Sequence, residues 1–276
     1  MNVAPGKENE RMNFENRIQK FNSLLTENDR KIIKYLLANK DTILNKTIVD
    51  LSEAIHVSPA SITRFCKKVD FNSFQEMKFH LGGRPTELNK ADDTLDTIYN
   101  YYQSIIKSTQ QFISEEQTTR IVSLILNAKK VVFCGIGNSG LIANEFNSRI
   151  ERMGINSNSI TDTHAMLMKT SLLGESDLLI CFSNTGKTKS VIDSAKLAQE
   201  NHVPTVVVTN YDDTLLTKFA NEVVLISSYK YIDDEKFVNS QLPGLFFLDL
   251  LIYKLLSNDK LMINYQKTLK AINEHS

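Results

Sequence analysis

The chain has 276 residues, of which 42% are hydrophobic and 23% charged, and its formal net charge at pH 7 is zero. This composition favours globular packing over disorder, and the length is sufficient for two domains of ordinary size. No apolar run approaches the roughly 20 residues of a membrane span, and the first 25 residues lack the apolar core of a signal peptide. We therefore expect a cytoplasmic protein without a membrane partner.

Charge is unevenly distributed along the chain. Residues 1–90 carry 15 Lys/Arg against 11 Asp/Glu, a net charge of +4, whereas residues 91–276 carry 17 against 21. A basic first part joined to a mildly acidic second part suggests a polyanion-binding domain attached to a body of a different kind.

Cysteine and histidine residues give no sign of a metal site. The three cysteines lie in apolar stretches without CxxC spacing, which predicts buried free thiols in a reducing compartment; they are Cys66, Cys134 and Cys181. The five histidines are scattered along the chain, at His56, His80, His164, His202 and His275. We therefore expect neither a metal nor another cofactor.

Residues 13–80 are predicted to be helical. Thr26 is a favourable N-cap for a helix that places Ile32, Ile33, Leu36 and Leu37 on one face. A further helix ends near Ile55. The next begins with Ser58 as its cap and Pro59 in its first position, which is a strong start signal.

The last two of these helices, within residues 47–69, have the pattern of a helix-turn-helix. The second helix is expected to turn Ile62, Phe65 and Val69 inward and its polar residues outward, where they can enter a DNA major groove. An ordinary three-helix domain with a solvated polar face has the same pattern. The predicted DNA-binding residues are Ser58, Pro59, Ser61, Thr63, Arg64, Lys67 and Lys68.

The best domain boundary follows residue 81. Gly82, Gly83 and Pro85 stop a helix, and a polar run follows them. A long helix, about 92–112, then leads into the second part. We divide the chain into a helix-turn-helix domain at 1–82, a linker with its helix at 83–112, and a second domain at 113–276.

From residue 129 onward, short β-branched runs alternate with helical stretches. The runs are "VVFCG", "DLLICFS", "TVVVTN" and "EVVLISS". This alternation is typical of βαβ units that form a parallel sheet covered by helices. The predicted fold is thus an all-helical N-terminal domain followed by a doubly wound α/β domain with a five-stranded parallel sheet.

The stretch "VVFCGIGNSGLIANEF" predicts a strand, a glycine turn and a helix. Gly135, Gly137 and Gly140 satisfy the GxGxxG pattern, and Asp162 stands where an acid could bind a ribose. A dinucleotide-binding domain is therefore one alternative.

A second loop, "SNTGKT", follows another strand and is not expected in a dinucleotide site. It is not a Walker A loop either, because Cys181 stands where that motif needs glycine. Its hydroxyl and amide groups, together with a glycine and a helix start, fit a phosphate dianion on a small molecule. A hydroxyl-rich helix cap without a ligand is the plainer alternative.

The helical part resembles the N-terminal domain of RpiR-type bacterial transcriptional regulators. The resemblance covers some 55 residues from Leu25 to Leu81. Asp70 stands where that family usually has Gly; we expect it to close the recognition helix in a left-handed conformation at a small cost in stability. The matching motif residues are Ser58, Ser61, Arg64, Phe65, Cys66, Lys67, Lys68, Phe71, Phe74 and Glu76.

Residues 129–210 resemble the SIS (sugar isomerase) domain, which occurs in phosphosugar isomerases and as the effector domain of RpiR-type regulators. The phosphate loop of that family, Ser-x-Ser-Gly-x-Thr-x-Glu, is matched at Ser183, Gly186 and Thr188, whereas Thr185 replaces its second Ser and Ser190 its acid. "DTHAMLM" matches the Asp-x-His segment of the family. The effector-binding residues that the two loops and the resemblance together predict are Gly137, Asn138, Ser139, Ser183, Asn184, Thr185, Gly186, Thr188 and His164.

Sugar isomerisation requires a base in the pocket, and the sequence offers none with support. The acid beside the phosphate loop is replaced by Ser190, His164 stands alone, and Glu145 and Glu151 fit a solvated helix face. We therefore expect no catalytic residue.

The leading hypothesis is a transcription factor whose affinity for double-stranded DNA is controlled by a phosphosugar. It would act as a homodimer or homotetramer on a palindromic operator, and the helix at about 92–112 would carry the change. One alternative is a phosphosugar isomerase or lyase with a fused DNA-binding head, and another is a nicotinamide-dependent enzyme.

Overall fold

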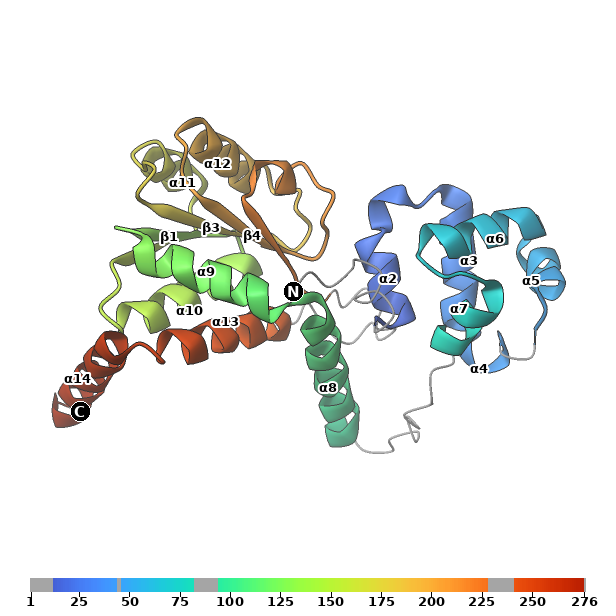
Figure 1. The fold of residues 1–276 in the computed structure, drawn as a ribbon, viewed down its shortest axis with the longest axis horizontal. Helices are drawn as coiled ribbons and strands as arrows, with labels where there is room; N and C mark the ends of the chain where they lie inside the picture. The colour runs from blue at the N-terminus through green and yellow to red at the C-terminus, as the bar shows by residue number, and fades with distance from the viewer. Residues whose placement is uncertain (1–11, 44–45, 82–93, 228–240, 276) are drawn as a thin grey trace. The chain divides into compact units, whose positions relative to one another are not determined.

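The computed structural model describes residues 12–43, 46–81, 94–227 and 241–275 (Figure 1). The chain separates into two compact units, Met1–Tyr101 and Tyr102–Ser276, which we describe one at a time. Within the described ranges, none of the helices combines the length and the hydropathy that crossing a lipid bilayer requires.

In the residues that the structure describes, the first unit is all-helical, as the sequence predicts. Its helices are α2 (Phe14–Lys20), η1 (Asn22–Leu24), α3 (Glu27–Ala38), α4 (Lys40–Ile43), α5 (Ile48–Ile55), α6 (Pro59–Lys68) and α7 (Phe74–Leu81). Thr26 and Thr47 form capping boxes at the starts of α3 and α5, and Ser58 caps α6 with Pro59 in its first turn. The start signals read from the sequence are therefore confirmed.

The core of this unit involves the two helices of the helix-turn-helix, α5 and α6, and the helices around them. Ile62, Phe65 and Cys66 of α6 are buried, as is Val69 just after it. Phe14, Ile32, Leu36 and Leu51, on the neighbouring helices of the unit, are also fully buried. The inward face predicted for α6 is thus confirmed. Burial raises the pKa of the Cys66 thiol to about 12, so it stays protonated.

Two left-handed residues frame α6. His56, which ends α5, has φ 54°, and Asp70, which follows α6, has φ 62°. Short polar residues and histidine tolerate this region better than most side chains. The buried guanidinium of Arg17 donates to the carbonyl of Asp70 and lies 4.1 Å from the centre of the Phe71 ring. The left-handed closure expected at Asp70 is therefore confirmed, and α2 holds it in place.

The second unit begins within α8 (Thr94–Phe112), the helix predicted at about 92–112; the first two residues of that range lie outside the described residues. Its other elements are α9 (Glu115–Asn127), β1 (Val131–Cys134), α10 (Asn138–Glu151), β2 (Ser157–Ile160), α11 (Thr163–Thr170), β3 (Leu178–Phe182), α12 (Lys189–Glu200), β4 (Thr205–Thr209), η2 (Thr217–Phe219), β5 (Glu222–Leu225), α13 (Leu242–Leu255) and α14 (Asp259–His275). The five strands are all parallel, in the order β2-β1-β3-β4-β5. The predicted doubly wound five-stranded sheet is confirmed.

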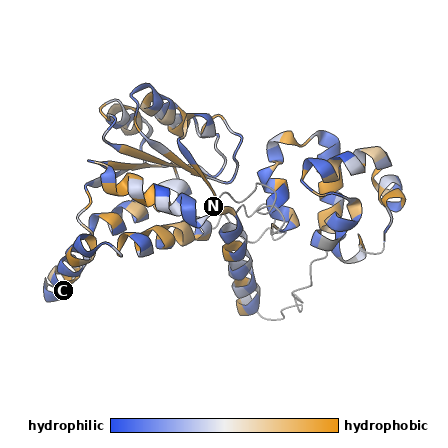
Figure 2. Ribbon diagram, viewed as in Figure 1, coloured by the Kyte–Doolittle hydropathy of each residue, from blue (hydrophilic) through white to orange (hydrophobic). Residues whose placement is uncertain are grey.

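Helices cover both faces of this sheet (Figure 1). Successive strand residues point to opposite faces, so Val131 and Phe133 pack with α9, α10 and α13, whereas Val132 and Cys134 pack with α11 and α12. Figure 2 shows hydrophobic residues along the strands and on the helix faces turned toward them. Because both faces are covered, the central strands β1 and β3 are continuous apolar runs, whereas the edge strand β2 is mostly polar.

All three cysteines are buried free thiols, as the sequence predicts. Cys134 and Cys181 are register partners on β1 and β3, and their Sγ atoms lie 3.4 Å apart. The hydrogen bond with Cys134, together with burial, raises the pKa of Cys181 well above its usual value.

Candidate functional site

The strand order places a topological switch point between β1 and β3. The chain leaves β1 toward α10 on one face of the sheet and leaves β3 toward α12 on the other. Neighbouring strands lie roughly 4.8 Å apart, and Cys134 is in register with Cys181, so the loops that follow the two strands start side by side. Ligands of doubly wound sheets bind at this point.

The first loop turns tightly from β1 into α10. Gly137, the N-cap of α10, has φ 59° and ψ −127°. Residues other than glycine rarely adopt this backbone conformation. A Cβ at Gly135 would overlap the backbone of Ser139, and one at Gly140 would overlap Thr161. Glycine at these positions therefore lets the helix start close to the sheet. Asn138 is exposed at the mouth of the loop, and Ser139 is almost buried beneath it.

The second loop follows β3 and is closed by its own hydroxyl groups. The hydroxyls of Ser183 and Thr188 lie 3.2 Å apart, and the N–H of Lys187 donates to Oγ1 of Thr185 at 3.3 Å. Gly186 has φ 62°, and a Cβ there would overlap the side chain of Thr214. The loop thus rests against the segment after β4 and presents its turn outward.

Both loops end at helix starts without a side-chain cap. Gly137 has no side chain that could cap α10, and the side chain of Thr188 makes no capping bond to α12, whereas the side chain of Asp162 caps α11. The first N–H groups of a helix need a partner, and the helix dipole favours an anion there. Lys187, exposed in the second loop, adds a cation that the sequence-based prediction left out.

The segment after β2 reaches the same edge of the sheet, since Ile160 is in register with Cys134. Asp162 accepts a hydrogen bond from the N–H of Ala165 at 2.9 Å, which engages its carboxylate in capping α11. His164 is exposed in the first turn of that helix. The predicted effector-binding residues therefore all lie on loops or helix starts at the carboxyl edge of three adjacent strands. Their contact with a ligand stays a prediction.

The sequence-based prediction missed Asn210 and Thr214, which support the second loop from behind. The N–H of Asn210 donates to the carbonyl of Asn184 at 3.1 Å, and Thr214 lies against Gly186. The signal for Asn210 was present in "TVVVTN", where a polar residue directly follows a buried strand at its carboxyl end.

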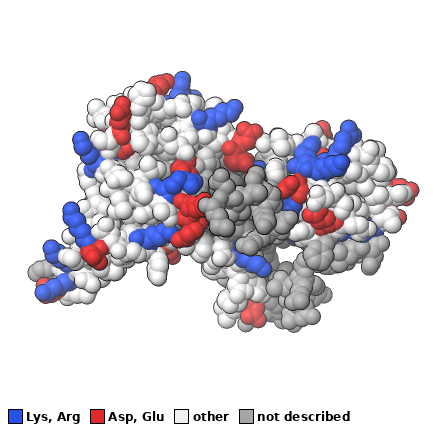
Figure 3. Space-filling model, viewed as in Figure 1, with Lys and Arg blue, Asp and Glu red and all other residues white. Residues whose placement is uncertain are grey.

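In the helical unit, α6 carries the candidate DNA-contacting residues. Ser58, Pro59, Thr63, Arg64 and Lys67 are exposed, and Ser61 is partly exposed. The hydroxyls of Ser58 and Ser61 lie 3.0 Å apart, and Nη2 of Arg64 donates to Oγ of Ser61 at 3.1 Å. Figure 3 shows Lys and Arg side chains gathered along the upper edge of this unit. The exposed polar face has the composition of a major-groove recognition helix.

Lys68, at the end of α6, lies differently from the other predicted DNA-binding residues. Its ammonium bonds to Oδ2 of Asp29, and the Asp29 side chain is only 7% exposed. The same oxygen accepts the N–H of Thr26 at 2.7 Å and its hydroxyl at 2.8 Å. Burial raises the pKa of Asp29, but the bonds from Lys68 and Thr26 outweigh it and hold that pKa below its ordinary value. Lys68 thus ties α6 to the start of α3.

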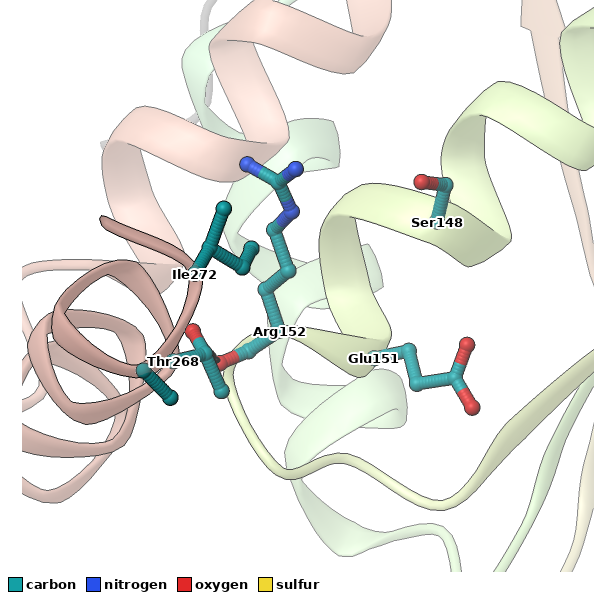
Figure 4. Close-up of a pocket in the computed structure, with 6 residues that line it drawn as sticks. Ser148, Glu151, Arg152, Thr268 and Ile272 are labelled. Carbon is teal, nitrogen blue, oxygen red and sulfur yellow. Dashed lines mark hydrogen bonds between the residues drawn. The ribbon is translucent and has the colours of Figure 1, made fainter. Parts of the chain in front are cut away.

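A separate hollow of about 430 Å³ lies at the other end of α10, against α14 (Figure 4). It is lined by Ser148, Glu151, Arg152, Thr268, Ala271 and Ile272. The hydroxyl of Thr268 donates to the carbonyl of Arg152 at 3.1 Å, and Figure 4 shows the Glu151 and Arg152 side chains pointing away from one another. Because the C-terminus of α10 carries the negative end of the helix dipole, this hollow suits an anion less well than the loops.

A helix-turn-helix unit followed by a doubly wound α/β unit with anion-type loops is the arrangement of a two-domain transcriptional regulator. The family model described as the helix-turn-helix domain of the rpiR family matches residues 12–87, and the SIS domain model matches residues 124–253. The chain belongs to the RpiR family of HTH-type transcriptional regulators.

Relatives and solved structures agree with this assignment. An HTH-type transcriptional regulator of Clostridium perfringens is 30% identical over 241 residues, which cover 82% of this chain and 86% of the relative. The regulator HexR of Escherichia coli is 25% identical, with 95% of each chain covered. In structure, the chain is similar to the NanR protein of Vibrio vulnificus, solved in complex with ManNAc-6P, at a TM-score of 0.62 and 23% identity, with 96% of this chain and 99% of NanR covered. At that identity the structural likeness supports the fold.

Proposed function

We propose that this regulator binds double-stranded DNA through α6 and that a phosphorylated sugar, held at the carboxyl edge of the sheet, controls its operator affinity. The observation that carries the proposal is the adjacency of two loops, 135–139 and 183–188, at the switch point between β1 and β3. Each loop leads into a helix that begins without a side-chain cap.

These loops supply the groups that a phosphate dianion needs. Hydroxyls of Ser183, Thr185 and Thr188 and the helix N–H groups donate, and Lys187 adds a positive charge at the rim. The phosphate is bound by the second loop and the sugar extends toward Asn138 and His164, which are exposed at the same edge. The NanR neighbour was solved with a compound of this chemical class.

At the DNA, α6 enters the major groove, with Arg64 and Lys67 as its exposed cations. Two copies of the chain would read the two halves of a palindromic operator, because a symmetric homo-oligomer presents its recognition helices as a pair. The ligand then acts by changing how the oligomer presents these helices, and the binding free energies of ligand and operator are coupled in both directions.

We further propose that the chain senses the sugar without converting it. Its relatives are named as transcriptional regulators, and the position of the loop acid holds Ser190. Glu145 on α10 is bonded to Arg149, with 2.7 Å between Oε1 and Nε. Among the predicted effector-binding residues, His164 is the side chain that could act as a base. A turnover assay with sugar phosphates, repeated with His164→Ala, tests for an isomerase or lyase activity.

A thermal-shift screen tests the ligand class. The panel holds glucosamine 6-phosphate, N-acetylmannosamine 6-phosphate, glucose 6-phosphate and ribose 5-phosphate, each paired with the same sugar without phosphate. A ligand at 100 times its Kd stabilises the folded state by about 2.7 kcal/mol and raises Tm accordingly. We expect at least one phosphosugar to raise Tm while its unphosphorylated partner does not. Equal Tm shifts for the phosphorylated and unphosphorylated sugar in every pair would contradict a phosphate-binding site.

A further inference from the structure

We propose that Asn210 is a positioning residue of the ligand loop and that it transmits the state of that loop to α8, the helix that continues toward the DNA-binding unit in sequence. The inference rests on the proposed ligand site and names how that site is connected to the rest of the chain. Three consecutive sets of contacts within the second unit carry it.

The first contacts join the ligand loop to the segment after β4. The carbonyl of Asn184 accepts the N–H of Asn210 at 3.1 Å and the hydroxyl of Thr209 at 3.4 Å. On the other side of the loop, Gly186 lies directly against Thr214. The loop therefore cannot change its turn without moving the segment 209–214.

The second contacts join Asn210 to the end of β5. Asn210 is 5% exposed, and its side-chain amide nitrogen donates to the carbonyl of Ile226 at 3.0 Å and to that of Ser227 at 2.9 Å. Both amide hydrogens are thereby used on neighbouring carbonyls. A residue that bonds the loop through its backbone and β5 through its side chain makes the two move together.

The third contacts join the end of β5 to α8. The hydroxyls of Ser227 and Ser108 lie 2.9 Å apart, and the N–H of Ser227 donates to Oγ1 of Thr109 at 3.4 Å. Ser108 and Ser227 are both less than 9% exposed and Thr109 is fully buried, so water does not compete for these bonds. These are polar contacts between segments 118 or 119 residues apart in the sequence.

Together these contacts form one buried polar chain from the ligand loop to α8. A phosphate that captures the N–H groups and hydroxyls of the loop replaces the bonds which now close the loop, namely those between Ser183 and Thr188 and between Lys187 and Thr185. The carbonyl of Asn184 turns with the loop, and Asn210 passes this change to Ser227 and α8. Coupling of this kind needs contiguous contacts and a direct experimental test.

Hydrogen exchange of the full-length protein tests the connection. Glucosamine 6-phosphate, N-acetylmannosamine 6-phosphate and ribose 5-phosphate are added separately, and exchange is followed in peptides covering 183–188 and 102–112. In the wild type, we expect a phosphosugar that protects the loop also to slow exchange in 102–112, by roughly two- to thirtyfold. In Asn210→Ala the loop stays protected, whereas the effect on 102–112 is lost.

Asn210→Ala leaves two buried carbonyls without their donor and therefore also lowers stability. For this reason Ser108→Ala serves as a second variant. It removes a single hydroxyl at the far end of the chain of contacts and should also abolish the effect on 102–112. Ser194→Ala is the matched control; this buried serine on α12 has no hydrogen-bond partner among the described residues, and both effects should persist.

The outcomes separate the two proposals. If no phosphosugar protects 183–188 in the wild type, the ligand site itself is wrong and the connection falls with it. If the loop is protected but 102–112 does not respond, or responds equally in Asn210→Ala and Ser108→Ala, the connection is wrong and the ligand site stands.

Discussion

The hydroxyl groups of Ser183 and Thr188 lie 3.2 Å apart and form a hydrogen bond across the loop between β3 and α12. Thr188 is also the N-cap of α12, yet its side chain accepts no bond from that helix. The two hydroxyls satisfy each other without a ligand, and an incoming oxyanion can take both. Under the proposed function, the loop therefore has a closed state, held by this bond, and a ligand-bound state in which the bond is replaced.

Thr188→Val removes one of these hydroxyls while keeping the shape of the side chain. Because hydrogen bonds to a charged group contribute about 1.5–3 kcal/mol, we expect phosphosugar affinity to fall roughly 10- to 100-fold, as measured by titration calorimetry. The matched control is Thr170→Val on α11, whose buried hydroxyl has no partner among the described residues. Equal affinities for the wild type and both variants would remove Thr188 from the site.

Lys67 and Lys68 are adjacent in the sequence but should affect DNA binding differently. Lys67 is exposed, so Lys67→Ala should lower the steepness of log Kobs against log salt by about 0.9, as expected for one lost phosphate contact. Lys68→Ala should leave the slope unchanged and lower the free energy of unfolding, because the carboxylate of Asp29 loses its cationic partner. A slope change for Lys68→Ala equal to that of Lys67→Ala would show that Lys68 contacts DNA directly.

The pair of Asp29 and Lys68 also predicts a pH dependence of stability. The pKa of Asp29 is lower in the folded than in the unfolded protein, so the unfolded state binds more protons between the two values. The contribution of ionised Asp29 to the free energy of unfolding is fully present above about pH 5. It is lost as the pH falls below about 4 and through the folded-state pKa of Asp29. Urea denaturation of the wild type and Asp29→Asn should show a stability difference that is constant at neutral pH and shrinks in acid. A difference that persists unchanged at low pH would contradict this assignment.

Asp70→Gly should stabilise the protein. Asp70 has φ 62°, a conformation that glycine adopts without the penalty that a Cβ brings. The bond from Arg17 goes to the backbone carbonyl of Asp70 and is retained in the variant. We expect the free energy of unfolding to rise by up to about 1 kcal/mol in urea denaturation. Asp70→Val should lower it; the opposite order would mean that the Asp70 side chain stabilises this turn.

Much of the fold could be predicted from local signals. Thr26, Ser58 and Pro59 mark helix starts by their own chemistry, and β-branched runs mark the strands, so the sequence predicts both. The bond between Lys68 and Asp29 could not be read in this way, because it joins residues 39 apart whose distance is set by packing. The same holds for Asn210, which depends on the register of β4 and β5.

The most direct test of the account is an anisotropy titration of a labelled operator duplex, selected from a random library by the full-length protein. The titration is run with and without the phosphosugar that most raises Tm, on the wild type and Thr188→Val. We predict that the phosphosugar changes the wild-type operator Kd at least about fivefold, as typical allosteric coupling requires. In Thr188→Val, more of the phosphosugar is needed for the same change. An operator Kd that is the same with and without saturating phosphosugar would contradict the central claim.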